Sequence, residues 1–171
     1  DPYWPAWSPD GERLAFSADV DGQSDVFSVD LDGGSLERLT EDPGEDRHPA
    51  WSPDGEQLAF SSDRSGSFQV YTMDDRGRDL EQRTTAADLL EAARDADVLR
   101  QEARVSRWPR PGEADAWAPR WQADGAVLAM TTNVAGDADL ALLDLEDDGI
   151  RILPGAFDQD ENQAVFSPLD G

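Results

Sequence analysis

Cysteine and lysine are absent from this 171-residue chain, and histidine occurs only once. Without cysteine the chain has no disulfide framework, no reactive thiolate and no cysteine-based metal site. No apolar run approaches the ~18 residues that a membrane-spanning helix needs, so we expect no membrane insertion. An initiator methionine and a signal-peptide pattern are also missing, and the chain begins in the middle of a motif. These features predict a segment of a longer protein.

Positive charge is scarce. Acidic residues outnumber basic ones 38 to 14, every basic residue is arginine, and the formal net charge is −24. Such a chain repels phosphate backbones, so we expect no nucleic-acid partner. An excess of aspartate is typical of proteins in high salt, where counterions screen the repulsion. A GC-rich genome also replaces lysine by arginine. If the chain is adapted to high salt, we expect the folded domain to lose stability at low ionic strength.

The most informative feature present is an internal repeat. The eight residues PAWSPDGE occur at Pro5–Glu12 and again at Pro49–Glu56, 44 positions later. A third copy reads APRWQADG, and a fourth begins at about residue 158, with Phe166 in the tryptophan position, before the chain stops. The three complete copies share Pro two residues before a tryptophan, Asp-Gly three and four residues after it, and Leu seven residues after it. The tryptophans are Trp7, Trp51 and Trp121.

Each copy has the pattern of four β-strands. Apolar residues alternate or form short runs between Asp-Gly and Gly-Gly turns, which indicates strands and hairpins. The run LAF in the second strand indicates burial on both faces. A four-stranded unit of about 44 residues packed between similar units is a propeller blade. The sequence therefore predicts an all-β fold, a β-propeller segment of three four-stranded blades plus the start of a fourth, with the tryptophans packed between blades.

An insertion separates the second and third copies. Trp51 and Trp121 are 70 residues apart, 26 more than the repeat of 44. Thr85 and Asp88 form a capping-box pattern, and apolar residues follow at helical spacing, which predicts a helix at about 86–104. We place the blades at about 1–40, 45–84 and 115–154, the helical insertion at about 85–113 and the start of blade four at about 158–171.

The first two copies resemble the TolB-type propeller repeat, in the stretches PAWSPDGERLAFSADVDGQSDVFSVD and HPAWSPDGEQLAFSSDRSGSFQVYTMD. The resemblance covers residues 1–84 strongly, 115–153 moderately and 158–171 in degenerate form. It implies a propeller, with two functions open: a non-catalytic module that binds or scaffolds a protein or peptide, or the gating propeller of a prolyl oligopeptidase-type serine peptidase, whose catalytic domain lies outside this chain. The same repeat occurs in the dipeptidyl peptidase family. Relatives are often periplasmic or exported, which slightly favours an extracytoplasmic location.

Acidic residues precede the first strand of each copy by a fixed interval. They are Asp1, Glu45, Asp115 and Asp160, six residues before the anchor aromatic. One interpretation is an acidic ring around the channel that attracts cations or a basic peptide. The other, which we favour, is that each carboxylate caps the turn into the strand by accepting backbone N–H bonds.

Two patterns that invite catalysis or metal binding are incomplete. In ADVDGQSD, Asp19, Asp21 and Asp25 do not follow calcium-loop spacing and do not recur in the other copies, so we expect a hairpin turn with Gly22 at positive φ. His48 stands where the other copies have Trp4 and Ala118, and no G-x-S-x-G motif occurs. We expect no metal, no cofactor and no enzyme activity in this chain.

Aromatic residues outside the anchor positions are the candidates for recognition. Tyr3, Trp4 and Trp117 lie near the first strands, and Trp108 lies in the inserted loop. Loops at these places commonly carry binding sites, although partial core roles remain an alternative. Three blades do not close a propeller, so the open blade edges predict either further blades elsewhere or self-association.

Overall fold

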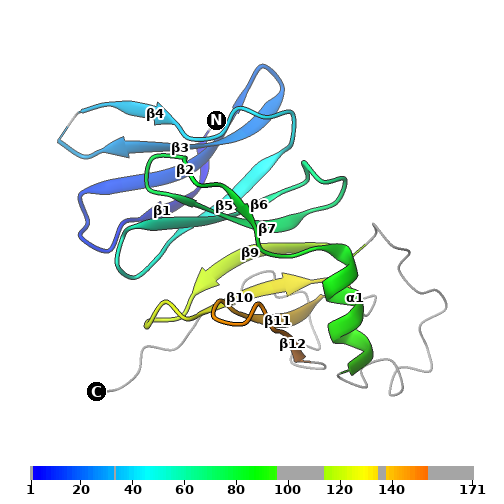
Figure 1. Cartoon of the computed structure of the whole chain (residues 1–171). Coiled ribbons are helices and arrows are strands. Elements are labelled where there is room, and N and C mark those ends of the chain that lie inside the picture. The colour runs from blue at the N-terminus through cyan, green and yellow to red at the C-terminus, as the bar shows by residue number, and fades with distance from the viewer. Residues whose placement is uncertain (1, 33, 96–113, 135–137, 154–171) are drawn as a thin grey trace.

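The computed structural model describes residues 2–32, 34–95, 114–134 and 138–153. They form three four-stranded antiparallel sheets and one helix, and each sheet follows the order of the chain (Figure 1). Blade 1 contains β1 (Pro2–Trp7), β2 (Arg13–Val20), β3 (Gln23–Asp30) and β4 (Leu36–Arg38). Blade 2 contains β5 (Asp46–Trp51), β6 (Gln57–Ser62), β7 (Gln69–Asp74) and β8 (Glu81–Gln82). Blade 3 contains β9 (Ala116–Trp121), β10 (Val127–Thr132), β11 (Asp139–Asp144) and β12 (Ile150–Leu153). The partial propeller of four-stranded blades predicted from the sequence is confirmed.

The Ser-Pro-Asp-Gly stretch forms the turn between the first two strands. In blade 1, Ser8 Oγ donates to Asp10 Oδ1 at 2.5 Å, and Asp10 Oδ1 also accepts the Glu12 N–H at 3.0 Å. Gly11 takes φ 73°, which a side chain would disfavour. Blade 2 repeats the network through Ser52 and Asp54. The hydrogen bond from serine, followed by the backbone bond, lowers the pKa of both aspartates.

A left-handed residue interrupts the first strand of every blade. Trp4, His48 and Ala118 have φ values of 51°, 55° and 52°, and the register with the second strand shifts at or beside each of them. Non-glycine residues adopt this conformation rarely, so its recurrence at one offset shows that the bulge belongs to the repeat. The bulge redirects the side chains at the start of the strand.

Blades pack through one recurring set of side chains, which we call the tryptophan face. Its members in blade 2 are Trp51, Leu58, Phe60, Tyr71 and Met73, all buried in one core with Ala15 and Val26 of blade 1. In blade 3 they are Trp121, Leu128, Met130, Ala141 and Leu143, which pack with Ala59 and Val70 of blade 2. The face that Ala15, Val26, Ala59 and Val70 present is called the receiving face.

In blade 1 the tryptophan face is open. Its members are Trp7, Leu14, Phe16, Phe27, Val29 and Leu36, by offset and by strand pairing. Trp51 is 8% exposed, whereas Trp7 is 60% exposed and Leu36 is 62% exposed. The prediction that the anchor tryptophans pack between blades is therefore confirmed for Trp51 and Trp121 and wrong for Trp7, because no described element lies against that face.

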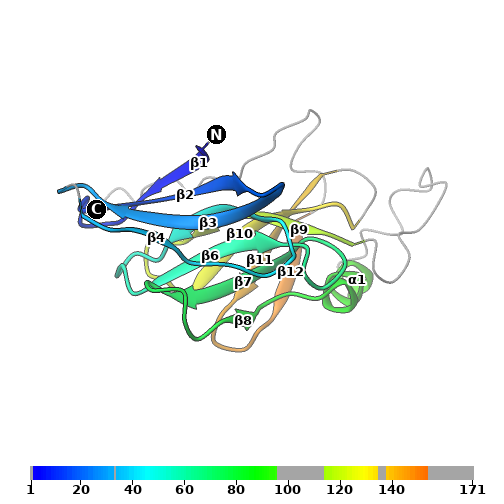
Figure 2. The same ribbon diagram turned by 90° about the horizontal axis from the view of Figure 1, so that it is seen from above.

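Helix α1 (Ala86–Asp95) follows blade 2 and packs beside β12 of blade 3 (Figure 2). The capping box forms: Asp88 Oδ2 accepts the Thr85 N–H at 3.1 Å, and Thr85 Oγ1 accepts the Asp88 N–H at 3.2 Å. Leu89 and Ala93 are fully buried, as their helical spacing predicts. The rest of the predicted helix, residues 96–104, and the fourth repeat lie outside the described residues. In the part that is described, no helix is long and apolar enough to cross a membrane.

The ADVDGQSD stretch is a hairpin, as predicted. Asp21 and Gly22 form its tip with φ values of 54° and 88°. Asp19 hydrogen-bonds with Tyr3, whereas Asp25 is fully buried and pairs with Arg38 at 2.7 Å. Burial, opposed by Arg38, raises the pKa of Asp25.

Candidate functional site

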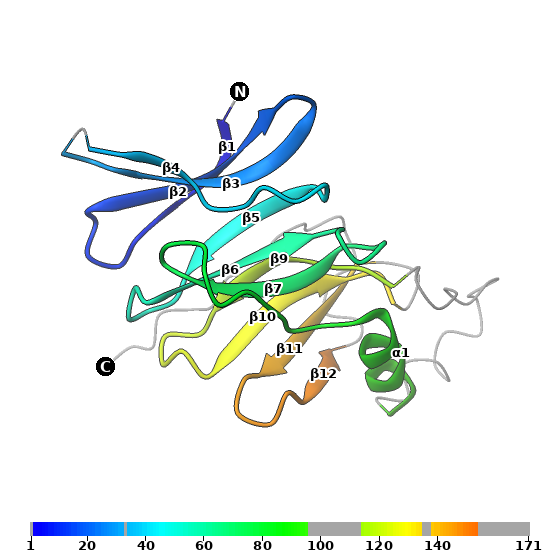
Figure 3. The same ribbon diagram turned by 45° about the horizontal axis from the view of Figure 1, so that its top comes forward.

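The first strand of each blade is its inner strand. β1 lies beside β5, and β5 lies beside β9, so residues at equal offsets in the three blades approach one another (Figure 3). Three residues before the anchor tryptophan, the blades carry Trp4, His48 and Ala118. Four residues before it, they carry Tyr3, Arg47 and Trp117. The bulge at the left-handed position thus gathers large side chains from neighbouring blades.

Trp4 and His48 stack across the seam between blades 1 and 2. Their ring centroids are 3.9 Å apart with an interplanar angle of 34°. The ring of Tyr3 lies nearly perpendicular to the same indole, with centroids 4.6 Å apart. The Tyr3 hydroxyl hydrogen-bonds with the Asp19 carboxylate and lies 2.6 Å from Ser24 Oγ. Burial, followed by the bond to Asp19, raises the pKa of Tyr3.

Arg47 adds a cation to these rings. Its guanidinium lies 5.7 Å from the centroid of Trp4 and 5.3 Å from that of Phe68, within the range of cation–π attraction. Glu45 Oε2 accepts a hydrogen bond from Arg47 Nη2 at 3.0 Å. The Arg47 side chain remains 36% exposed, and Tyr3 and Trp4 are half-buried. The five residues Tyr3, Trp4, Arg47, His48 and Phe68 are called the inner-strand cluster.

His48 is neutral at the centre of this cluster. Burial, followed by the nearby charges of Arg120 and Arg47, lowers its pKa to about 4. Arg120 is half-buried on β9, and burial lowers its pKa as well. Arg120 Nη1 donates to the carbonyl of Pro119 at 2.8 Å. Two arginines therefore act on His48 at the inner strands of a chain whose net charge is −24.

Among the described residues, the carboxylates of Glu45 and Asp115 accept no backbone N–H bond from the turn into their own strand, so the favoured capping interpretation is wrong for these two residues. Asp115 Oδ1 accepts the N–H of Phe68, from the neighbouring blade, at 2.9 Å, and Asp115 Oδ2 accepts from Asn133 Nδ2 at 2.8 Å. Glu45 pairs with Arg47, and its N–H donates to Asp63 Oδ1 at 2.8 Å. Asp1 and Asp160 lie outside the described residues.

Of the predicted aromatic residues, Tyr3 and Trp4 come together, and Trp117 is half-buried at the equivalent position of β9. Trp108 lies outside the described part of the chain. Sequence reasoning missed Arg47, Phe68 and Arg120. For Arg120 the sequence did contain a signal, because this large charged residue stands where the other copies of the repeat have Ala6 and Ala50. Across the described ranges, no three His, Asp or Glu side chains gather so as to hold a metal ion.

A sequence model of the TolB beta propeller domain matches residues 3–97, more than half of the chain. The chain belongs to the TolB β-propeller family. A comparison with curated proteins gives no match.

Solved structures place this TolB-type chain among propellers. A protein described as TolB from Agrobacterium tumefaciens has a TM-score of 0.68 at 24% identity over 89% of this chain and 48% of its own. TolB from Acinetobacter baumannii has a TM-score of 0.65 at 24% identity, over 88% of this chain and 32% of its own. A puromycin-hydrolyzing peptidase from Mycobacterium tuberculosis has a TM-score of 0.60 at 17% identity, over 95% of this chain and 22% of its own. The chain thus spans half or less of each protein, and these likenesses concern the fold.

Proposed function

We propose that this TolB-type chain is a non-catalytic binding module that holds a protein or peptide segment against the inner-strand cluster. The observation that carries the proposal is the stack of Trp4 on His48, with Arg47 between Trp4 and Phe68. Aromatic and arginine side chains that are partly exposed and held in place are the residues that dominate protein recognition.

The chemistry of the cluster suits a peptide. The half-buried rings of Tyr3 and Trp4 offer apolar area to a side chain. The exposed part of Arg47 offers N–H donors to a backbone carbonyl or a carboxylate oxygen. Neighbouring contacts fix these side chains before binding, since Arg47 is held by Glu45 and Tyr3 by Asp19. A prearranged site loses less entropy when its ligand binds.

The experiment selects short peptides from a random library on the immobilised chain in molar NaCl. Affinities of the selected peptides are then measured by fluorescence polarisation with the wild type, Trp4→Ala, Arg47→Gln and the control Leu80→Ala, which changes an exposed leucine of blade 2. We expect each cluster variant to lose at least about tenfold in affinity, ~1.4 kcal/mol, and the control to lose none. Selected peptides that bind all four proteins equally would overturn the proposal.

A second candidate function is the gating propeller of a serine peptidase. The similarity to the puromycin-hydrolyzing peptidase favours it, and this function requires an α/β-hydrolase domain in the intact protein, because the chain contains no G-x-S-x-G motif. An antibody against this chain would isolate the native polypeptide for reaction with a fluorophosphonate, which labels activated serines. Labelling supports the peptidase, and its absence supports the binding module.

A further inference from the structure

Aspartate is followed directly by glycine at several places in this chain, and the structure describes both residues of five such pairs. The aspartates of these pairs are Asp10, Asp21, Asp54, Asp124 and Asp148. The carboxyl group of an aspartate can react with the backbone nitrogen of the next residue, and glycine has no Cβ to block the approach. The reaction requires Cγ to reach that nitrogen, so hydrogen bonds that hold either group elsewhere prevent it.

In three of the pairs a hydrogen bond holds the carboxylate. It accepts the N–H of the residue two positions later, at 3.0 Å in each of Asp10, Asp54 and Asp124. The bond from a serine hydroxyl, followed by this backbone bond, also lowers the pKa of Asp10 and of Asp54. A lower pKa keeps the carboxylate ionised, and an ionised carboxylate reacts poorly because it has no hydroxyl to lose as water.

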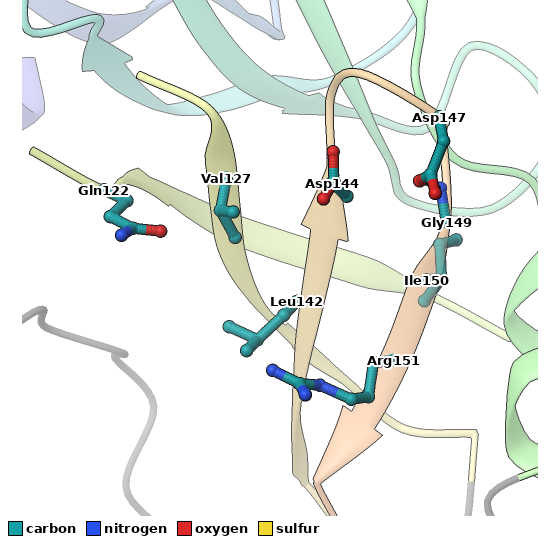
Figure 4. A pocket seen from close by; sticks show the side chains of 8 residues that line it. All are labelled: Gln122, Val127, Leu142, Asp144, Asp147, Gly149, Ile150 and Arg151. Carbon is teal, nitrogen blue, oxygen red and sulfur yellow. The ribbon is translucent and has the colours of Figure 1, made fainter. Parts of the chain in front are cut away.

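In a fourth pair a hydrogen bond holds the nitrogen instead. The N–H of Gly149 donates to Asp147 Oδ1 at 2.8 Å in the turn after β11 (Figure 4). Asp148 Oδ1 lies 3.9 Å from Arg83 Nη1. The Gly149 nitrogen is therefore directed to the carboxylate of Asp147 and away from that of its own partner, Asp148.

Neither kind of hydrogen bond holds Asp21 and Gly22. They are the two residues of the turn that joins the paired residues Val20 and Gln23, and both are exposed. Within the described part of the chain, the Asp21 carboxylate and the Gly22 N–H make no hydrogen bond or ion pair. A Cβ added at Gly22 meets nothing within 4 Å, so the reacting carboxyl group and water have room at this turn.

We propose that Asp21 is a modification site, where the free carboxyl group reacts with the Gly22 nitrogen and an isoaspartyl residue results. The nitrogen loses its proton and bonds to Cγ, the carboxyl group loses its hydroxyl, and proton and hydroxyl leave as water. Water then adds to the main-chain carbonyl carbon of Asp21 in the resulting cyclic imide, and the bond from that carbon to the Gly22 nitrogen breaks. The chain now continues through Cγ, with its composition and charge unchanged. The freed α-carboxylate is the group that isoaspartyl methyltransferases esterify from S-adenosylmethionine.

The modification lengthens the main chain by one carbon atom at the tip of the hairpin. The pairing of Val20 with Gln23 depends on the length of the turn, so the end of the hairpin must move. Gln23 Nε2 donates to the carbonyl of Asp42 at 2.9 Å, and Asp19 hydrogen-bonds with Tyr3. Because a displaced hairpin weakens both contacts, we expect the modified chain to unfold at a lower urea concentration than the fresh chain.

Incubation of the folded full chain at neutral pH in molar NaCl tests the proposal. Samples taken over time are digested with trypsin, and the peptides are incubated with a purified isoaspartyl methyltransferase and labelled S-adenosylmethionine. Since trypsin cleaves after arginine, we expect the label to accumulate in the peptide that covers residues 14–38. A chain incubated in urea, where no fold holds any Asp-Gly pair, should also acquire label in the other peptides that contain such a pair.

Two variants assign the label within this peptide. Asp21→Glu keeps the charge of the turn but requires a larger ring for the reaction, so the label should fall to background. Asp32→Glu is the matched control and should be labelled as the wild type is, because Asp32 also precedes a glycine but its Oδ1 accepts the N–H of Gly34 at 2.9 Å. Label that is absent from the folded wild type, spread evenly over its Asp-Gly peptides, or retained in Asp21→Glu would overturn the proposal.

Discussion

The indole N–H of Trp121 donates to the carbonyl of Ala50 at 3.0 Å, joining the inner strands of blades 3 and 2. Trp51 occupies the same offset in blade 2, yet its Nε1 has no hydrogen-bond partner among the described residues, and its ring packs under Arg13 instead. The two seams share apolar contact and differ in polar detail. The burial of apolar side chains is therefore the interaction that both seams share and that holds the blades together.

This difference makes Trp121→Phe more damaging than Trp51→Phe. Both substitutions shorten a packed aromatic ring, but only the first removes a hydrogen bond and leaves the Ala50 carbonyl without it. The second removes a buried N–H that has no partner. We expect Trp121→Phe to lower the free energy of unfolding by about 1 kcal/mol more than Trp51→Phe. Urea unfolding in molar NaCl measures both, and equal losses would contradict the argument.

Alanine substitutions at two glycines with nearly equal φ distinguish the cost of backbone strain from the cost of steric crowding. Gly11 and Gly77 have φ values of 73° and 78°. A Cβ at Gly11 meets nothing within 4 Å, whereas a Cβ at Gly77 would lie 2.6 Å from the carbonyl oxygen of Leu39 in blade 1. We expect Gly11→Ala to cost about 1 kcal/mol through its φ alone and Gly77→Ala to cost about 1–3 kcal/mol more through overpacking. Thermal and urea unfolding should rank them in that order, and equal costs would show that blade 1 moves to accommodate the added methyl group.

Arg64 compensates a buried carboxylate. Asp46 is fully buried, and Arg64 Nη2 lies 2.9 Å and 3.1 Å from its two oxygens. Burial raises the pKa of Asp46, and Arg64 opposes that change. Arg64→Met leaves the carboxylate without this partner, so we expect a loss of about 3–5 kcal/mol at pH 7.

The pH dependence of that loss identifies its cause. Without Arg64 the pKa of Asp46 rises further, so acidification protonates and neutralises the group more readily, and the deficit relative to the wild type should shrink. Adding Asp46→Asn to Arg64→Met should recover part of the stability at pH 7. Arg76→Met, at an exposed arginine, is the control. A deficit that stays constant between pH 7 and pH 5 would assign the loss to lost packing.

The sequence predicts the parts of this fold that depend on short separations along the chain. The Ser8–Asp10 turn and the Thr85–Asp88 box need only residues two or three positions apart, and the burial of Leu58 follows from the apolar run around it. Strand boundaries are less visible, because β1 and its equivalents begin before the Pro-Ala-Trp motif that identifies them.

The candidate site depends on contacts between blades. Trp4 and His48 stack because two inner strands place their bulges side by side, and no local pattern in either strand encodes that distance. Arg47 and Phe68 join from positions 21 residues apart. The sequence marks such a site only indirectly, by large or charged residues where other copies of the repeat have small ones.

His48 provides a prediction about pH. Its pKa is about 4 in the folded chain, because of burial and the charges of Arg120 and Arg47, against about 6.5 for an unperturbed histidine. Between these values the unfolded chain binds more protons, so stability rises with pH in this window and is lost on acidification. His48→Phe keeps a ring against Trp4 and removes the titration. Asp25 and Asp46, whose raised pKa acts in the opposite direction, are present in both proteins. Between pH 7 and pH 4, we expect the free energy of unfolding of the wild type to fall by about 1–3 kcal/mol more than that of His48→Phe. Urea unfolding at a series of pH values measures both. Parallel curves for the two proteins would show that His48 reaches solvent.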